Sequence, residues 1–272
     1  MSSKPILSIA ILNLMPTKEA TATQLASLLS QNNLFKVEIT LLYPKTHYQA
    51  KAIPDDLQEN YLTFDDVRDQ LFDGFIITGA PVEQLPFEHV DYWLELKTIF
   101  TYLKATHTHT HSLFICWGAQ AALYEYYQIP KIHLSTKLVG IFQHRFCVAE
   151  HWLANTTKTD FHAPHSRNTT VDSCLVSQHP ELIPVAQSDA AGLYLATNYN
   201  GLETYVFGHP EYATETLEKE YLRDVQTLTK PILPLYYFPG NNPLNTPINT
   251  WNEHGKNLFK NWMKFIRTKK LN

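Results

Sequence analysis

The sequence predicts an α/β fold, with a mostly parallel sheet and helices on both of its faces. Two patterns in the first half of the chain support this class. Short, largely apolar runs alternate with segments whose apolar residues recur at helical spacing. Near-continuous apolar runs are typical of parallel strands that helices cover on both faces. A chain of 272 residues with 44% hydrophobic residues is also long enough to bury a sizeable core.

The elements expected in the first half follow in regular order. A strand over 6–14 precedes a helix over 18–30, and a second strand over 37–43 ends at Pro44. A third strand over 75–77 stops at Gly79-Ala80-Pro81, and an amphipathic helix is expected over 90–103. A fourth strand over 113–115 leads directly into a helix that begins at Trp117.

The second half is expected to hold shorter strands and two further helices. The strand candidates are 139–142, 182–186, 193–196 and 205–207, and Pro184 argues against the second of them. Helices are expected over 214–227 and 251–267. Because we find no internal repeat and no linker rich in Gly and Ser, we expect a single domain over 1–272.

Composition narrows the class of protein. A net charge of -4 offers no basic surface for nucleic acid, and no apolar run is long enough to span a membrane. The strand pattern begins at Ile6, which leaves no room for a signal peptide. Three cysteines, Cys116, Cys147 and Cys174, cannot all pair with one another. We therefore expect a cytoplasmic enzyme with no nucleic-acid or membrane partner.

Cys116 is the first candidate for chemistry. It ends the apolar run Leu113-Phe114-Ile115 and directly precedes the helix expected from Trp117. The positive end of a helix dipole stabilises a thiolate, and a nucleophile at a strand-to-helix turn is the arrangement of a nucleophile elbow. The alternative is that Cys116 is a small buried apolar residue, as most free cysteines are.

His209 is the best candidate for a base that would activate this thiol. It follows the strand expected over 205–207, and histidines at such strand ends lie on the rim where open α/β sheets bind ligands. Glu211 lies two residues further on and is placed to hold the imidazole in one tautomer. Alternatively, both residues are loop polars beside Pro210. The presence of Cys116 favours the catalytic interpretation.

His107, His109 and His111 alternate as strand residues on one face would, a spacing that can serve a metal. The run contains no Asp, Glu or Cys, so we favour a solvated loop and expect no metal site.

The tetrad Pro164-His165-Ser166-Arg167 lies in a region without clear periodicity. It is interpreted either as a site for a small zwitterion, since Arg binds carboxylates with two donors, or as a surface turn. Two further polar residues have simple interpretations. Arg223 is expected to form an ion pair with Glu220, three residues before it on the same helix, and Lys137 is expected to be exposed to solvent.

Taken in order, these segments resemble the homoserine O-acyltransferase family of the MetA type. The resemblance covers almost the whole chain. It rests on Ile11-Leu12-Asn13-Leu14-Met15-Pro16, Ile77-Thr78-Gly79-Ala80-Pro81-Val82-Glu83, the run from Phe87-Glu88 through Tyr92-Trp93, Ile115-Cys116-Trp117-Gly118-Ala119-Gln120-Ala121-Ala122-Leu123, Pro164-His165-Ser166-Arg167, Gly208-His209-Pro210-Glu211-Tyr212, Glu220-Tyr221-Leu222-Arg223-Asp224 and Tyr237-Phe238-Pro239.

The resemblance implies a fold like that of class I glutamine amidotransferases and a ping-pong reaction with no bound cofactor. Cys116 would carry the acyl group of acyl-CoA as a thioester, with His209 as general base and Glu211 as its partner. Matching positions that bind or select the amino acid are Lys137, Ser166 and Arg223. The family also implies a homodimer.

Glu83 occupies the position that sets acyl choice in this family, where glycine goes with succinyl-CoA and glutamate with acetyl-CoA. A glutamate fills space and repels the terminal carboxylate of a succinyl group. We therefore expect acetyl-CoA as co-substrate.

The acceptor is less clearly indicated, because the chain departs from the family pattern. It has Ala20-Thr21-Ala22-Thr23 where acidic residues are usual, and Asn168 where an aromatic residue is common. Some short members of the family acetylate L-serine, which is one methylene shorter than L-homoserine. A pocket distinguishes one methylene by only about 1–3 kcal/mol. We expect L-homoserine, with L-serine as the alternative acceptor.

Two other classes of protein remain as alternatives. A glutamine amidotransferase would share the cysteine, histidine and glutamate, but Phe114 stands where that class prefers glycine before its nucleophile. A non-catalytic binding protein on the same fold would not need Cys116, His209 and Glu211 together.

Overall fold

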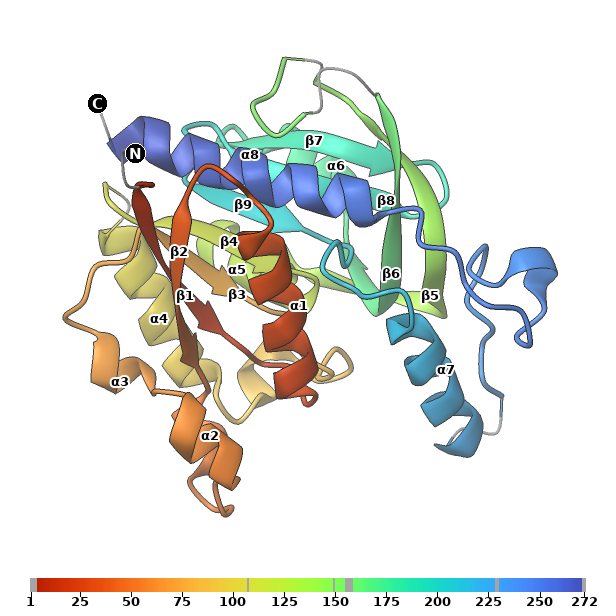
Figure 1. Ribbon diagram of the computed structural model, residues 1–272, viewed down its shortest axis with the longest axis horizontal. Helices are drawn as coiled ribbons and strands as arrows, with labels where there is room; N and C mark the ends of the chain where they lie inside the picture. The colour runs from red at the N-terminus through yellow and green to blue at the C-terminus, as the bar shows by residue number, and fades with distance from the viewer. Residues whose placement is uncertain (1–3, 107, 149, 155–158, 228–229, 271–272) are drawn as a thin grey trace.

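The computed structural model describes residues 4–106, 108–148, 150–154, 159–227 and 230–270. Within these residues a nine-stranded sheet has the order β2-β1-β3-β4-β9-β8-β7-β5-β6 (Figure 1). The strands are β1 (Ile6–Leu12), β2 (Lys36–Leu42), β3 (Gly74–Ile77), β4 (His111–Ile115), β5 (Lys131–Phe146), β6 (Asp160–Val171), β7 (Leu182–Ser188), β8 (Gly192–Asn198) and β9 (Glu203–Val206).

Helices cover this sheet and extend from one end of it. They are α1 (Lys18–Ser30), α2 (Asp55–Asn60), α3 (Phe64–Val67), α4 (Trp93–Ala105), α5 (Trp117–Tyr127), α6 (Ser173–Gln178), α7 (Thr216–Thr227) and α8 (Asn252–Lys270), with short 3₁₀ turns at Lys45–Tyr48, Phe87–His89 and Pro239–Asn241. None of the helices in the described residues has the length and apolar character needed to cross a bilayer.

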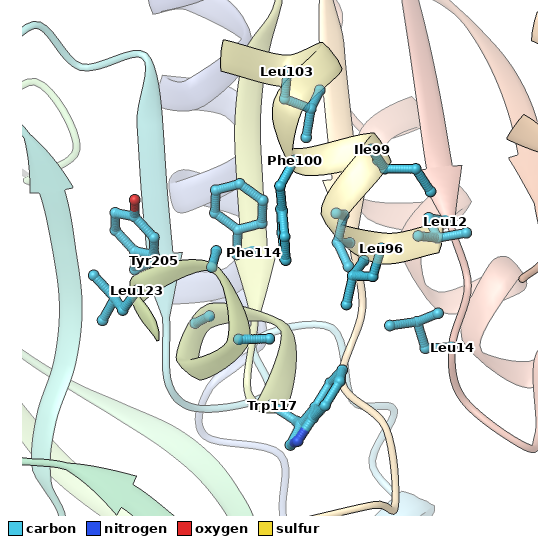
Figure 2. Packing of buried hydrophobic residues seen from close by; sticks show 14 of the residues in the cluster. Leu12, Leu14, Leu96, Ile99, Phe100, Leu103, Phe114, Trp117, Leu123 and Tyr205 are labelled. Carbon is cyan, nitrogen blue, oxygen red and sulfur yellow. The ribbon is translucent and has the colours of Figure 1, made fainter. Parts of the chain in front are cut away.

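Successive side chains of the central strands point to opposite faces of the sheet, so the core forms two layers. In β4, Phe114 packs into the layer under α4 and α5, whereas Leu113 and Ile115 pack into the layer under α1 and α8. Figure 2 shows the first layer, where Phe100 of α4 lies against Phe114. The predicted α/β class with helices on both faces is confirmed, because strands with two apolar faces need a helix layer on each.

The sheet is parallel in one half and antiparallel in the other. Strands β1, β2, β3, β4 and β9 pair in parallel, while β9, β8, β7, β5 and β6 pair antiparallel. The antiparallel half contains most of what the sequence did not reveal. Strand β5 extends well beyond the predicted 139–142, and β6 was not predicted as a strand.

The histidine run does not form an extended strand over its length. His107 lies outside the described residues, His109 lies in a turn, and His111 begins β4. In the described part of the chain, no cluster of three or more His, Cys, Asp or Glu side chains has a geometry that could hold a metal ion.

Candidate active site

A cleft of about 160 Å³ opens where the parallel strands end. Met15 follows β1, Gly79 follows β3, Cys116 follows β4 and His209 follows β9, so four strand ends contribute to one site. Open α/β sheets bind ligands at the carboxyl ends of their strands for this reason. The opposite wall comes from β5, β6 and α7.

Cys116 lies on a strained turn between β4 and α5, with φ 51° and ψ −113°. Its amide donates a hydrogen bond to the Val206 carbonyl at 2.7 Å, which ties the turn to β9. Gly118 lets α5 approach the end of β3, because a Cβ there would lie 2.7 Å from the Thr78 carbonyl oxygen. A backbone strained at a helix N-terminus and held from both sides is a mark of a functional residue.

His209 connects Cys116 to Glu211. The Nδ1–H of His209 donates to Oε1 of Glu211 at 2.7 Å, which leaves Nε2 for its hydrogen bond with the Cys116 thiol. The ring is 2% exposed and stacks on Tyr212 at 4.2 Å between ring centroids. The described residues therefore place a thiol, an imidazole and a carboxylate in one connected arrangement, which is the kind of set that nucleophilic catalysis can use.

Opposing influences set the pKa of His209. Burial alone would lower it, but the negative charges of Cys116 and Glu211, with hydrogen bonds to both, hold the pKa well above its usual value. The raised pKa favours the imidazolium form of His209 beside Cys116 and Glu211.

A cationic group forms one side of the cleft. Nζ of Lys137 donates to Asp224 at 2.8 Å, and the Arg223 guanidinium donates to the same carboxylate at 2.9 Å. Burial alone would raise the pKa of Asp224, but these two cations hold it below its usual value. The interpretations of Lys137 as solvated and of Arg223 as paired with Glu220 are thus both wrong. One carboxylate shared by two cations leaves positive charge available to a ligand.

Glu220 lies half-buried beside this group. It accepts hydrogen bonds from the Ser166 hydroxyl at 2.6 Å and from the Tyr212 hydroxyl at 2.7 Å. Since Tyr212 also stacks on His209, the Glu220 carboxylate is linked to the His209 ring through one side chain.

Glu83 lies on the loop after β3 and faces Asn168 of β6. Its carboxylate accepts hydrogen bonds from the backbone N–H of Asn168, at 3.1 and 3.2 Å to its two oxygens, and from the side-chain Nδ2 of Asn168 at 2.9 Å. Both residues line the cleft, and Glu83 is 9% exposed.

Of the tetrad 164–167, only Ser166 lines the cleft, because alternate residues of a strand face opposite sides. Arg167 points away and donates to the Ala191 carbonyl at 2.6 Å and to Nδ1 of His165 at 3.3 Å. The expectations of a surface turn, or of an Arg167 that binds a carboxylate ligand, are therefore wrong. The buried strand β6 instead separates the cleft from a second polar group.

The buried polar group behind β6 consists of His144, His165 and Arg167, and hydrogen bonds define the tautomers of its two histidines. His144 Nδ1 lies 2.9 Å from the Phe142 carbonyl and therefore carries a proton, so its Nε2 accepts from Nε2–H of His165 at 3.0 Å. His165 Nδ1 then accepts from Arg167. Burial lowers the pKa of His144 to about 3 and that of His165 well below its usual value, so both rings are neutral.

The structure brings all seven predicted site residues into or beside this cleft. Sequence reasoning missed Tyr212, Glu220, Asp224 and Asn168 as members of the site. Tyr212, Glu220 and Asp224 stand inside motifs that carried the family resemblance, which was the available signal. Asn168 was noticed only as a departure from the family pattern.

Residues 3–271 match the family model described as homoserine O-succinyltransferase. The chain belongs to this family. It is therefore an acyltransferase, and the alternative of a non-catalytic binding protein is set aside.

Curated relatives named homoserine O-acetyltransferase include one from Acetivibrio thermocellus, 44% identical over 95% of this chain and 84% of its own length. Another, from Thermotoga petrophila, is 45% identical over the same shares.

Solved structures confirm the expected likeness in fold. A glutamine amido transferase from Methylobacillus flagellatus superposes with a TM-score of 0.58 over 97% of this chain and 96% of that one, at 12% identity. A glutamine amidotransferase from Thermotoga maritima gives a TM-score of 0.55 over 97% of this chain and 99% of that one, at 10% identity. At such low identity the likeness concerns the fold alone, whereas the family match identifies an acyltransferase.

Proposed function

We propose that this enzyme transfers an acetyl group from acetyl-CoA to the side-chain hydroxyl of L-homoserine. The observation that carries the proposal is the Cys116–His209–Glu211 arrangement at the floor of a cleft whose wall is cationic. The names of the curated relatives and the glutamate at position 83 support acetyl as the acyl group.

In the first half-reaction, the Cys116 thiolate attacks the acetyl carbonyl carbon of acetyl-CoA. The bond from that carbon to the CoA sulfur breaks, and the His209 imidazolium gives its proton to the departing thiolate. The N-terminus of α5, where Cys116 is followed by Trp117, supplies first-turn amides without helical partners for the oxyanion. The products are free CoA and an acetyl thioester on Cys116.

In the second half-reaction, the same histidine acts as a base. The thioester carries no charge, so one of the charges that raises the pKa of His209 is lost on acylation, while burial continues to lower it. Neutral His209 takes the proton of the acceptor hydroxyl as its oxygen attacks the thioester. The Cys116 thiolate leaves, and the proton on His209 restores the starting pair.

The acceptor carries a carboxylate and an ammonium group, and the cleft offers partners for both. Arg223 and Lys137 are the cations for the carboxylate, while the half-buried Glu220 is the anion for the ammonium group. Ser166, which donates to Glu220, holds that carboxylate in place. These groups recognise the α-carbon substituents that L-serine and L-homoserine share, so the length of the side chain must be read nearer to Cys116.

Trapping the acyl-enzyme tests the mechanism. Wild-type protein incubated with acetyl-CoA labelled in the acetyl group should retain label after denaturation, and so should the control variants Cys147→Ala and Cys174→Ala, whose thiols are exposed. Cys116→Ala should retain none. Equal label on Cys116→Ala would refute the thioester.

Paired kcat/KM values for L-homoserine and L-serine test the acceptor. A higher value for L-homoserine supports the proposal, and a clear preference for L-serine would replace it with serine O-acetylation by the same steps. A homodimer and a cytoplasmic location also remain proposals, and light scattering of the purified protein would test the first.

A further inference from the structure

One strand carries two polar residues that bind carboxylates on opposite walls of the cleft. Ser166 and Asn168 are two residues apart on β6, so they face the same side at a spacing of about 7 Å. Ser166 binds Glu220 of α7, and Asn168 binds Glu83 of the loop after β3. The strand thus divides the cleft into an acceptor wall and a second wall built around Glu83.

Glu83 is held at both its backbone and its side chain. Lys131 at the start of β5 donates from Nζ to the Glu83 carbonyl at 2.7 Å, which fixes the loop. Asn168 donates to the carboxylate through its backbone amide at 3.1 Å and through Nδ2 at 2.9 Å. A glutamate without these donors could rotate about its side-chain bonds and move away from a larger acyl group.

The chemistry of asparagine suits this task. Its amide donates hydrogen bonds but carries no charge, so Asn168 holds the Glu83 carboxylate without neutralising it. A lysine or arginine at position 168 would hold Glu83 equally well but would cancel the repulsion of a second carboxylate.

We propose that Asn168 determines acyl-donor specificity by holding the Glu83 carboxylate in the cleft, where it excludes dicarboxylic acyl groups such as succinyl. This inference rests on the proposed acetyl transfer. Asn168 is a positioning residue, because it acts on the donor through Glu83.

The test compares kcat/KM for succinyl-CoA and acetyl-CoA in a double-mutant cycle. Glu83→Gly should raise the succinyl-to-acetyl ratio most. Asn168→Ala should raise it about tenfold, the size expected from loss of one hydrogen bond to a charged group. Asn168→Leu removes the side-chain donor at nearly constant size and should give a similar rise. Thr170→Ala, on the same face of β6 but outside the cleft lining, should leave the ratio unchanged.

The cycle also separates the possible failures. In the Glu83→Gly background, Asn168→Ala should change the ratio less than twofold, and a full tenfold change there would mean that Asn168 contacts the donor directly, which overturns the inference. An unchanged ratio in both Asn168 variants, beside a shifted ratio in Glu83→Gly, overturns the inference alone. An unchanged ratio in Glu83→Gly overturns the donor argument of the proposed function as well.

Discussion

The two walls of the cleft are built in different ways. The catalytic wall comes from the ends of parallel strands, and its key pair is close in sequence, with Glu211 two residues from His209. The selecting wall comes from antiparallel β5 and β6 together with α7 and the loop after β3 that carries Glu83. Its contacts join residues that are far apart, 87 positions for Lys137 and Asp224, and 85 for Glu83 and Asn168.

This difference suggests a division of labour. On the catalytic wall, local geometry sets the Cys116 turn and the His209–Glu211 pair, and the parallel sheet brings the two together. On the selecting wall, every pair is assembled by tertiary packing. If so, changes on the catalytic wall should damage both half-reactions, and changes on the selecting wall should damage only one of them.

The largest expected effect is on the catalytic wall. His209→Ala removes both the acid of the first half-reaction and the base of the second, so kcat should fall about 10⁴-fold with the fold intact. Stopped-flow release of CoA and steady-state turnover measure the two halves, and circular dichroism checks the fold. If His209→Ala lost turnover but kept the wild-type CoA burst, only the second half-reaction would depend on His209, which contradicts the proposed difference between the walls.

Arg223→Met tests the selecting wall. Loss of a guanidinium that binds a carboxylate should lower kcat/KM for the acceptor about 100-fold, since the remaining Lys137 offers only a point charge. The burst of CoA released in the first half-reaction should stay near the wild-type rate. The control is Lys219→Met on the same helix, an exposed cation that pairs with Glu215. A slowed burst in Arg223→Met would contradict the separation of the walls.

A smaller effect is expected from Gly118→Ala. The added methyl group would lie 2.7 Å from the Thr78 carbonyl oxygen and 2.9 Å from that of Ile77, so α5 must shift and move Cys116. Overpacking of this kind costs about 1–3 kcal/mol, and we expect both half-reactions to slow roughly tenfold. Thermal unfolding and the CoA burst measure the two consequences. An unchanged CoA burst together with a lowered Tm would contradict the expected slowing, because it would show that the Cys116 turn keeps its function when α5 moves.

The last prediction concerns stability as a function of pH, where the two sides of β6 should differ in sign. His209 has a raised pKa, so its contribution to stability is present below its unfolded pKa and is lost as pH rises through the folded one. His144, behind β6, has a pKa lowered to about 3, so stability is lost as pH falls below about 6.5.

His144→Gln should therefore flatten the acid side of the stability profile by about 1.4 kcal/mol per pH unit between pH 6 and 4. Urea unfolding at several pH values measures this slope. His133→Gln, at an exposed position, is the matched control. An identical slope in His144→Gln and wild type would mean that the ring accepts a proton in the folded protein.

Sequence reasoning succeeded where the determining interactions are local. The helix Lys18–Ser30 was predicted with its observed ends, and Cys116 was placed at its turn from the adjoining apolar and helical runs. Both predictions depend on periodicity within about a dozen residues.

It failed where buried polar groups obscure periodicity. Strand β6 contains polar residues on both faces, because Ser166 lies in the cleft and His165 belongs to the buried network behind it. Neither face therefore shows the apolar alternation by which a strand is found. The partner of Arg223 was missed for a different reason, since the adjacent Asp224 is shared with a lysine that only the fold brings near.

The same strand makes the site sensitive to the exact length of the chain. An extra residue inserted in β6 just before Ser166 would shift its register by one position and exchange its two faces. The guanidinium of Arg167 would then enter the cleft and attract the carboxylates of Glu83 and Glu220, while polar side chains of the cleft would replace it behind the strand. We therefore expect natural length variation in this protein to fall outside β6, where an added residue leaves the two faces of the strand unchanged.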